Sequence, residues 1–193
     1  MPSTGFWERA RTPAAFGMMI LMAVFNLLLI RQNLGLRAEL DKQRPKLLQP
    51  GDRAGAFAAP GLKGDIVSVD YAGRGPKRVF LYFSPDCPYC RDQFGFWREL
   101  LSKADENRFE VLGLVSDGED KNKVGEYLRS FGCDSLRTAL APNAVLRNYK
   151  LGATPTTLVV DNTGKVEHAW AGAWDTKGLR EASSAFGFSF QRN

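Results

Sequence analysis

The chain has 193 residues, of which 44% are hydrophobic and 24% charged, and it contains three cysteines. This composition excludes a collagen-like or low-complexity chain, and three cysteines are too few for a miniprotein held together by disulfides. Residues 1–50 carry seven Lys or Arg against three Asp or Glu, a net +4, whereas residues 51–193 carry 19 against 18, a net +1. The main domain therefore lacks the cationic surface that nucleic-acid binding requires.

An uncharged apolar segment runs from Pro13 to Ile30. As a helix its 18 residues would span about 27 Å, which is enough to cross the core of a bilayer. One alternative is a signal peptide, whose apolar region is usually shorter and ends in a cleavage site with small residues; another is a buried helix of a soluble protein. We expect a short tail over 1–12, a single transmembrane anchor over 13–30, a polar stalk over 31–50 and one domain over 51–193.

The charges beside this segment predict its orientation. Arg9 and Arg11 precede it, and five Lys or Arg follow it within about twenty residues. Because positive residues favour the cytoplasmic side, this count places the main domain in the cytoplasm. Leucines spaced along 31–49 indicate that a helix continues out of the segment until Pro45 and Pro50 end it.

Strands and helices alternate in the main domain. Continuous or alternating apolar runs predict strands, and apolar residues at helical spacing predict helices. The expected strands are 66–70, 78–84, 109–116, 156–161 and 165–170, and the expected helices are 90–103, 120–131, 143–149 and 175–186. Asn162-Thr163-Gly164 indicates a hairpin between the last two strands. This order predicts an α/β fold with a mixed sheet flanked by helices.

Two cysteines lie where a buried strand leads into a helix, in the sequence Asp86-Cys87-Pro88-Tyr89-Cys90. Pro88 suits the first turn of a helix, because its missing N–H costs nothing there. Cys87 is then at the helix N-terminus, where free N–H groups and the helix dipole stabilise a thiolate and lower its pKa. Cys90 lies one turn further on the same face, within reach of a disulfide. The spacing predicts a catalytic pair in which Cys87 attacks and Cys90 resolves.

A structural zinc site is an alternative for this pair, and it needs four ligands. The chain offers two further candidates, Cys133 and His168, and neither belongs to a second paired motif. A lone cysteine after a helix is more often a packing residue than a second redox thiol. His168 alternates with apolar residues along an expected strand and is interpreted as structural. We expect no metal and no other cofactor.

The chain resembles the membrane-anchored, TlpA-like thiol:disulfide oxidoreductases of bacteria, which belong to the thioredoxin superfamily. The resemblance rests on the strand VFLYFS leading into CPYC, on the segment GATPTTLVVD over 152–161 and on the following NTGKV. It implies a thioredoxin-like fold, and a cis Pro155 lying against the active-site disulfide of Cys87 and Cys90. It also implies that the backbone of Thr154 faces a bound substrate chain.

Three positions depart from the pattern of the superfamily. Asp86 and Leu81 stand where thioredoxins carry a Trp and a buried Asp, and Gln93 stands where some members carry a Glu. The sequence therefore assigns no residue to the handling of the Cys90 proton.

The resemblance implies an enzyme that exchanges its cysteine pair with protein thiols and disulfides, in the assembly of cysteine-containing proteins such as cytochromes. It places the domain on the periplasmic or extracellular side of the cytoplasmic membrane, against the charge count, and implies a membrane or soluble redox partner. One alternative is a copper metallochaperone of the same fold using Cys87, Cys90 and His168, although such proteins usually space their cysteines with three residues between them. Another is a peroxidase, which would want Thr where Ser84 stands.

Overall fold

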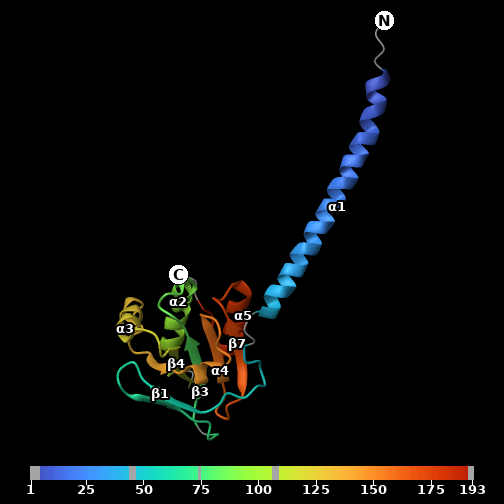
Figure 1. Ribbon diagram of the computed structural model, residues 1–193. Helices are drawn as coiled ribbons and strands as arrows, with labels where there is room; N and C mark the ends of the chain where they lie inside the picture. The colour runs from blue at the N-terminus through green and yellow to red at the C-terminus, as the bar shows by residue number, and fades with distance from the viewer. Residues whose placement is uncertain (1–4, 44–46, 74, 106–108, 191–193) are drawn as a thin grey trace. The chain divides into compact units, whose positions relative to one another are not determined.

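The computed structural model describes residues 5–43, 47–73, 75–105 and 109–190 (Figure 1). The chain divides into two compact units, Met1–Arg44 and Pro45–Asn193.

The described part of the first unit is a single helix, α1 (Gly5–Gln43). Within the described residues, one stretch of this helix, Ala15–Arg37, is long and apolar enough to cross a membrane. Its large apolar side chains are exposed, with Phe25 at 60% and Leu28 at 55%. Residues 1–4 of the expected tail and the expected helix end at Pro45 lie outside the described residues.

The second unit is built on a five-stranded sheet with the strand order β5-β4-β3-β6-β7. The first three strands of that order are parallel to one another, and β6 and β7 run antiparallel to their neighbours. This mixed sheet confirms the predicted thioredoxin-like fold class. The strands are β3 (Lys77–Tyr82), β4 (Phe109–Ser116), β5 (Arg137–Ala141), β6 (Thr156–Val160) and β7 (Val166–Ala171), and the helices are α2 (Pro88–Ser102), α3 (Lys121–Ser130), α4 (Asn143–Asn148) and α5 (Thr176–Phe186).

A small second sheet pairs β1 (Phe57–Pro60) with β2 (Ile66–Val69) in antiparallel register. The prediction of a strand near 66–70 is confirmed, but β1 and β5 are absent from the predicted elements. Both are short and rich in alanine, which has a low strand propensity, and β1 also ends in a proline. Their pairing partners, and not their own composition, make them strands.

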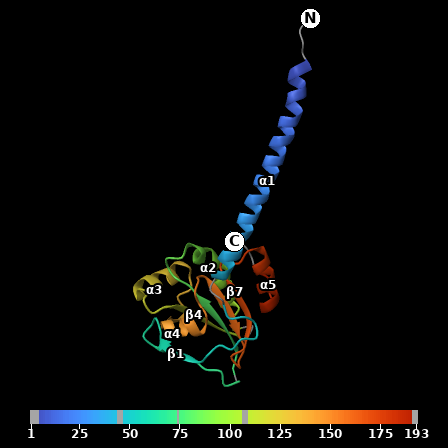
Figure 2. The ribbon, with the colours of Figure 1, turned by 45° about the vertical axis from the view of Figure 1, so that its right-hand side comes forward.

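Two apolar clusters cover the two faces of the main sheet. The first joins buried residues of α2, α3 and α5 to one face, and it includes the fully buried Phe94, Trp97 and Leu100 of α2. The second joins α4 and the β1–β2 hairpin to the other face, where Phe57 packs edge-on against Tyr149 with ring centroids 5.6 Å apart. Figure 2 shows α4 next to β1, away from α5. The sheet is therefore the middle layer of the domain, and the carboxyl ends of β3 and β4 share one edge.

Candidate active site

Cys87 caps the N-terminus of α2. Its backbone is extended (φ −82°, ψ 114°), and Pro88 occupies the first turn, as predicted. The turn before the helix is held by a hydrogen bond from the N–H of Cys87 to the carbonyl of Ser84 (3.1 Å). The N–H of Cys90 donates to the carbonyl of Cys87 at the same distance (3.1 Å), so the two cysteines share the first turn.

The two thiols lie in different environments. Cys87 is partly buried, whereas Cys90 is fully buried. Burial raises the pKa of Cys87, but hydrogen bonds with the Thr154 side chain, the Cys90 thiol and the N–H groups of Cys90 and Tyr89 outweigh it, so the pKa falls below its ordinary value. Burial raises the pKa of Cys90 to about 12. Cys87 is therefore the thiol of the pair that ionises more readily to the reactive thiolate.

The loop before β6 contacts Cys87 directly. The Thr154–Pro155 peptide bond is cis, which confirms the expectation for Pro155. The Sγ–H of Cys87 donates to the carbonyl oxygen of Thr154 (3.3 Å). On the other side of the bond, the N–H of Gly172 donates to the Pro155 carbonyl (2.7 Å) and joins the loop to the end of β7. A sulfur atom and a polypeptide loop thus meet at the carboxyl edge of the sheet.

The charge of Asp86 is offset by a residue that the sequence analysis did not single out. Lys123, near the start of α3, donates to both carboxylate oxygens of Asp86 at 2.5 and 2.6 Å. This pair raises the pKa of Lys123 and reduces the repulsion between Asp86 and a thiolate at Cys87. The two residues are 37 positions apart, so no local pattern indicates their contact.

The rim around Cys87 is open. Asp86, Pro88 and Tyr89 are exposed, Tyr89 by 66% of its surface. Residues at such a rim are available to contact a bound polypeptide.

Buried polar groups surround the other side of α2. Gln93 is fully buried, and its Oε1 accepts a hydrogen bond from the N–H of Trp174 (2.8 Å). Its Nε2, the hydroxyl of Tyr127 and the indole N–H of Trp174 have no hydrogen-bond partner in the described part of the chain. Burial, with smaller contributions from the nearby thiolate positions of Cys90 and Cys87, raises the pKa of Tyr127 to about 12. Tyr127, from α3, is a second neighbour of the cysteines that the sequence analysis missed.

His168 and Cys133 do not join the cysteine pair. The His168 ring stacks on Trp170, with centroids 5.3 Å apart and planes at 6°. Among the described residues, no group of three or more His, Cys, Asp or Glu side chains is placed to hold a metal ion. Cys133 is fully buried, and burial raises its pKa to about 11. These positions fit the structural interpretation of both residues.

Comparison with known proteins agrees with this geometry. The sequence matches the AhpC/TSA family over residues 50–169, which include both cysteines and the Thr154–Pro155 bond. The chain belongs to the AhpC/TSA family. The match covers more than half of the chain and leaves out the apolar helix α1.

Relatives of the chain include proteins named thiol-disulfide oxidoreductase ResA. ResA of Geobacillus kaustophilus is 31% identical over 124 residues, which are 63% of this chain and 69% of that protein. ResA of Geobacillus thermodenitrificans is 29% identical over 133 residues, which are 68% of this chain and 74% of that protein. This member of the AhpC/TSA family is a thiol-disulfide oxidoreductase of the thioredoxin superfamily.

A solved structure shows the same fold. The crystal structure of a protein named thiol:disulfide interchange protein DsbE, from Chlorobium tepidum, superimposes with a TM-score of 0.62 at 22% identity. The superposition covers 72% of this chain and 97% of that one.

Proposed function

We propose that Cys87 and Cys90 are the redox pair of this oxidoreductase, with Cys87 as the attacking thiolate. The contrast between the two thiols carries the proposal. Cys87 is accessible at the N-terminus of α2 and has a lowered pKa, while Cys90 is buried with a pKa of about 12. A thiolate is the nucleophile in disulfide exchange, so the reaction starts at Cys87.

The exchange proceeds in two steps. The Cys87 thiolate attacks one sulfur of a substrate disulfide, which forms a mixed disulfide and releases the other substrate sulfur as a thiolate. Cys90 then loses its proton and attacks Sγ of Cys87, which closes the Cys87–Cys90 disulfide and releases the second substrate thiol. Two electrons pass from the protein to the substrate, and the same steps in reverse oxidise a substrate dithiol.

Thr154 and Pro155 are proposed to hold the substrate chain beside Cys87. The carbonyl oxygen of Thr154 lies 3.3 Å from Sγ of Cys87, so a polypeptide whose cysteine approaches Cys87 must pass along this loop. Asp86, Pro88 and Tyr89 are exposed next to Cys87 in the chain and are proposed to contact the same substrate.

The chain is proposed to be a single-pass protein of the cytoplasmic membrane. The exposed apolar side chains of Ala15–Arg37 support this anchor, because such a surface is stable in a lipid environment. In this proposal residues 1–12 are a tail, 13–30 the anchor, 31–50 a stalk and 51–193 the catalytic domain. The resemblance to TlpA-like proteins supports a TlpA-like specificity and a catalytic domain on the periplasmic or extracellular side of the membrane. The proposed substrates are cysteine-containing proteins such as apocytochromes, and a separate redox partner is proposed to recycle the cysteine pair.

The flanking charges favour a cytoplasmic domain, whereas the proposal places the domain outside the membrane, so the orientation needs a direct test. An alkaline phosphatase reporter fused after Asn193 is expected to be active, since that enzyme needs an oxidising compartment to form its disulfides. A cytoplasmic fluorescent reporter at the same position serves as the matched control. An inactive phosphatase fusion would exclude a role in assembly outside the membrane.

A redox titration of the full chain in detergent tests the cysteine pair. We expect one reversible two-electron couple that is lost in Cys87→Ser and kept in Cys133→Ser. A potential near about −270 mV would indicate a reductant, and one near about −120 mV an oxidant that inserts disulfides. If no couple depends on Cys87 and the same preparation binds copper tightly, the oxidoreductase proposal is wrong and the metallochaperone takes its place.

A further inference from the structure

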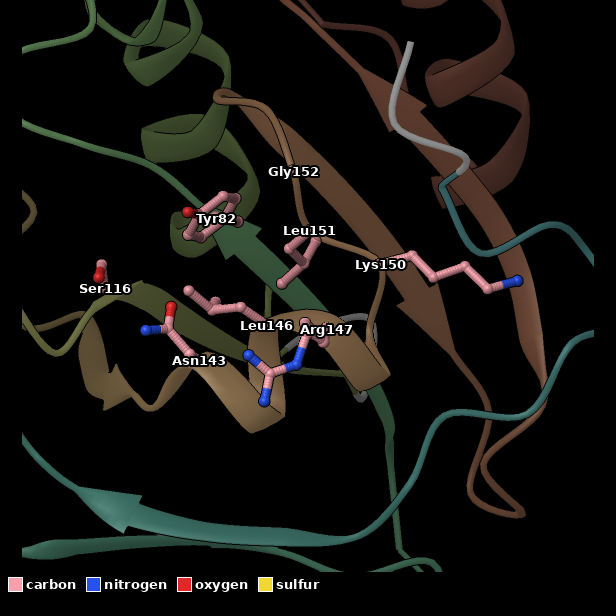
Figure 3. Close-up of a pocket in the computed structure, with 8 residues that line it drawn as sticks. All are labelled: Tyr82, Ser116, Asn143, Leu146, Arg147, Lys150, Leu151 and Gly152. Carbon is pink, nitrogen blue, oxygen red and sulfur yellow. The ribbon is translucent and has the colours of Figure 1, made fainter. Parts of the chain in front are cut away.

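A pocket of about 460 Å³ opens at the carboxyl edge of the main sheet (Figure 3). Tyr82 lines it at the end of β3 and Ser116 at the end of β4. Asn143 and Arg147 of α4 form one wall, and Gly152, in the loop that leads to Thr154, forms another. Crevices at the carboxyl ends of parallel strands are the usual place for ligands in open α/β sheets.

The polar groups of the pocket favour an anion. In the part of the chain that the structure describes, the guanidinium of Arg147 has no ion pair or hydrogen bond. Lys150, by contrast, pairs with Asp52 at 3.1 Å, and Figure 3 shows its side chain extending away from Arg147. No lining residue of the pocket is acidic. Arg147 is therefore the cation that is available to a ligand.

Two uncharged hydrogen-bond donors also line the pocket, and a buried leucine holds its helix against the sheet. The amide of Asn143 lies on the same side of α4 as Arg147 in Figure 3, four residues away and hence one helical turn. Burial, and to a smaller extent the charge of Glu119, raises the pKa of Tyr82, so its hydroxyl stays protonated and can donate a hydrogen bond. The buried Leu146, between Asn143 and Arg147, fixes α4 against the sheet.

The loop that runs from Gly152 to Thr154 connects one wall of the pocket to Cys87. Gly152 precedes Thr154 by two residues, a distance of at most about 7 Å. The carbonyl of Thr154 is 3.3 Å from Sγ of Cys87. An extended peptide advances about 3.3 Å per residue, so a side chain about three residues from a reacting cysteine can enter the pocket.

We propose that this pocket binds the carboxylate of an Asp or Glu side chain about three residues from the substrate cysteine that reacts with Cys87. A guanidinium can donate two parallel hydrogen bonds to a carboxylate, so it recognises both the charge and the planar shape of that group. The inference rests on the proposed function and adds a substrate preference to it. Acidic residues near the target cysteine then distinguish good substrates from poor ones.

Two matched peptides test this preference on the full chain in detergent. Each carries one cysteine as a mixed disulfide with 2-thiopyridine, and they differ only in having Glu or Gln three residues to either side of the cysteine. Attack by Cys87 on the peptide sulfur releases thiopyridone, whose absorbance gives the rate. The wild-type chain is expected to react about three- to tenfold faster with the Glu peptide, and Arg147→Gln is expected to bring this ratio close to one.

Arg180→Gln is the matched control, because Arg180 is also exposed but belongs to α5 and does not line the pocket. It should keep the wild-type ratio, and the Gln peptide should react with Arg180→Gln at the wild-type rate. The inference is wrong if the wild type shows no preference or if Arg147→Gln retains it, and fast release from both peptides would then still support the proposed function. If the wild type releases no thiopyridone from either peptide, the proposed function fails and the inference fails with it.

Discussion

The Cys90→Ser variant is expected to form a mixed disulfide with its substrate and to stop there. Cys87 keeps its place at the N-terminus of α2 and its contact with Thr154, so the first attack proceeds at a rate within about threefold of the wild type. The serine hydroxyl cannot displace a sulfur from Cys87, so turnover falls by about 1000-fold or more. Single-turnover and steady-state rates of reduction of a peptide disulfide, with mass spectrometry of the trapped adduct, measure the two effects.

Cys87→Ser is the control, and it should lose both steps while leaving Cys90 unreactive because that thiol is fully buried. The pH profile adds a separate check. Alkylation of Cys87 by iodoacetamide in Cys90→Ser should speed up with rising pH as the thiolate forms, and level off below the pH at which an unperturbed thiol does, because the pKa of Cys87 is lowered. Exchange that survives in Cys87→Ser and disappears in Cys90→Ser would reverse the two roles.

Elements and site residues could be predicted from the sequence wherever a pattern within a few neighbouring residues determines them. Cys87 and Pro88 lie at the start of α2 as predicted, because a buried strand, a short turn and a proline in the first helical turn are all encoded within a few residues. The buried face of α2 follows from helical spacing in the same way. The alanine-rich β5 was missed because its strand character comes from pairing with β4, and pairing across a sheet has no local signal.

The surroundings of the cysteines depend on contacts over long sequence distances. Lys123 reaches Asp86 and Tyr127 lies near Cys90 only because α3 packs beside α2 on the same face of the sheet. In the sequence, Tyr127 lies inside the expected helix over 120–131, and nothing in its local pattern marks it as a neighbour of the cysteines. The cis bond before Pro155 was expected from the resemblance, since the residues alone leave both isomers open.

Trp97→Ala is expected to lower the free energy of unfolding of the domain by about 3–5 kcal/mol. Trp97 is fully buried on α2, where its ring packs against Phe94 with centroids 5.1 Å apart. Its indole N–H donates to Oγ1 of Thr157 at 3.0 Å, so the variant leaves both a cavity and a buried hydroxyl with a lost partner. Urea unfolding in detergent, followed by circular dichroism, measures the loss.

Two further variants separate the packing of Trp97 from its hydrogen bond. Trp97→Phe keeps most of the apolar volume but leaves the hydroxyl of Thr157 without this hydrogen bond. Adding Thr157→Val removes that hydroxyl. The double variant should therefore be more stable than the sum of the two single effects predicts. A loss below about 1 kcal/mol in Trp97→Ala would contradict the role of this side chain in the core. Trp97 lies on the helix of Cys90, and Thr157 follows Pro155 by two residues, so the Trp97–Thr157 hydrogen bond connects the cysteine helix to the strand that follows the cis-proline loop. Loss of this bond should therefore also slow the exchange reaction of the folded protein.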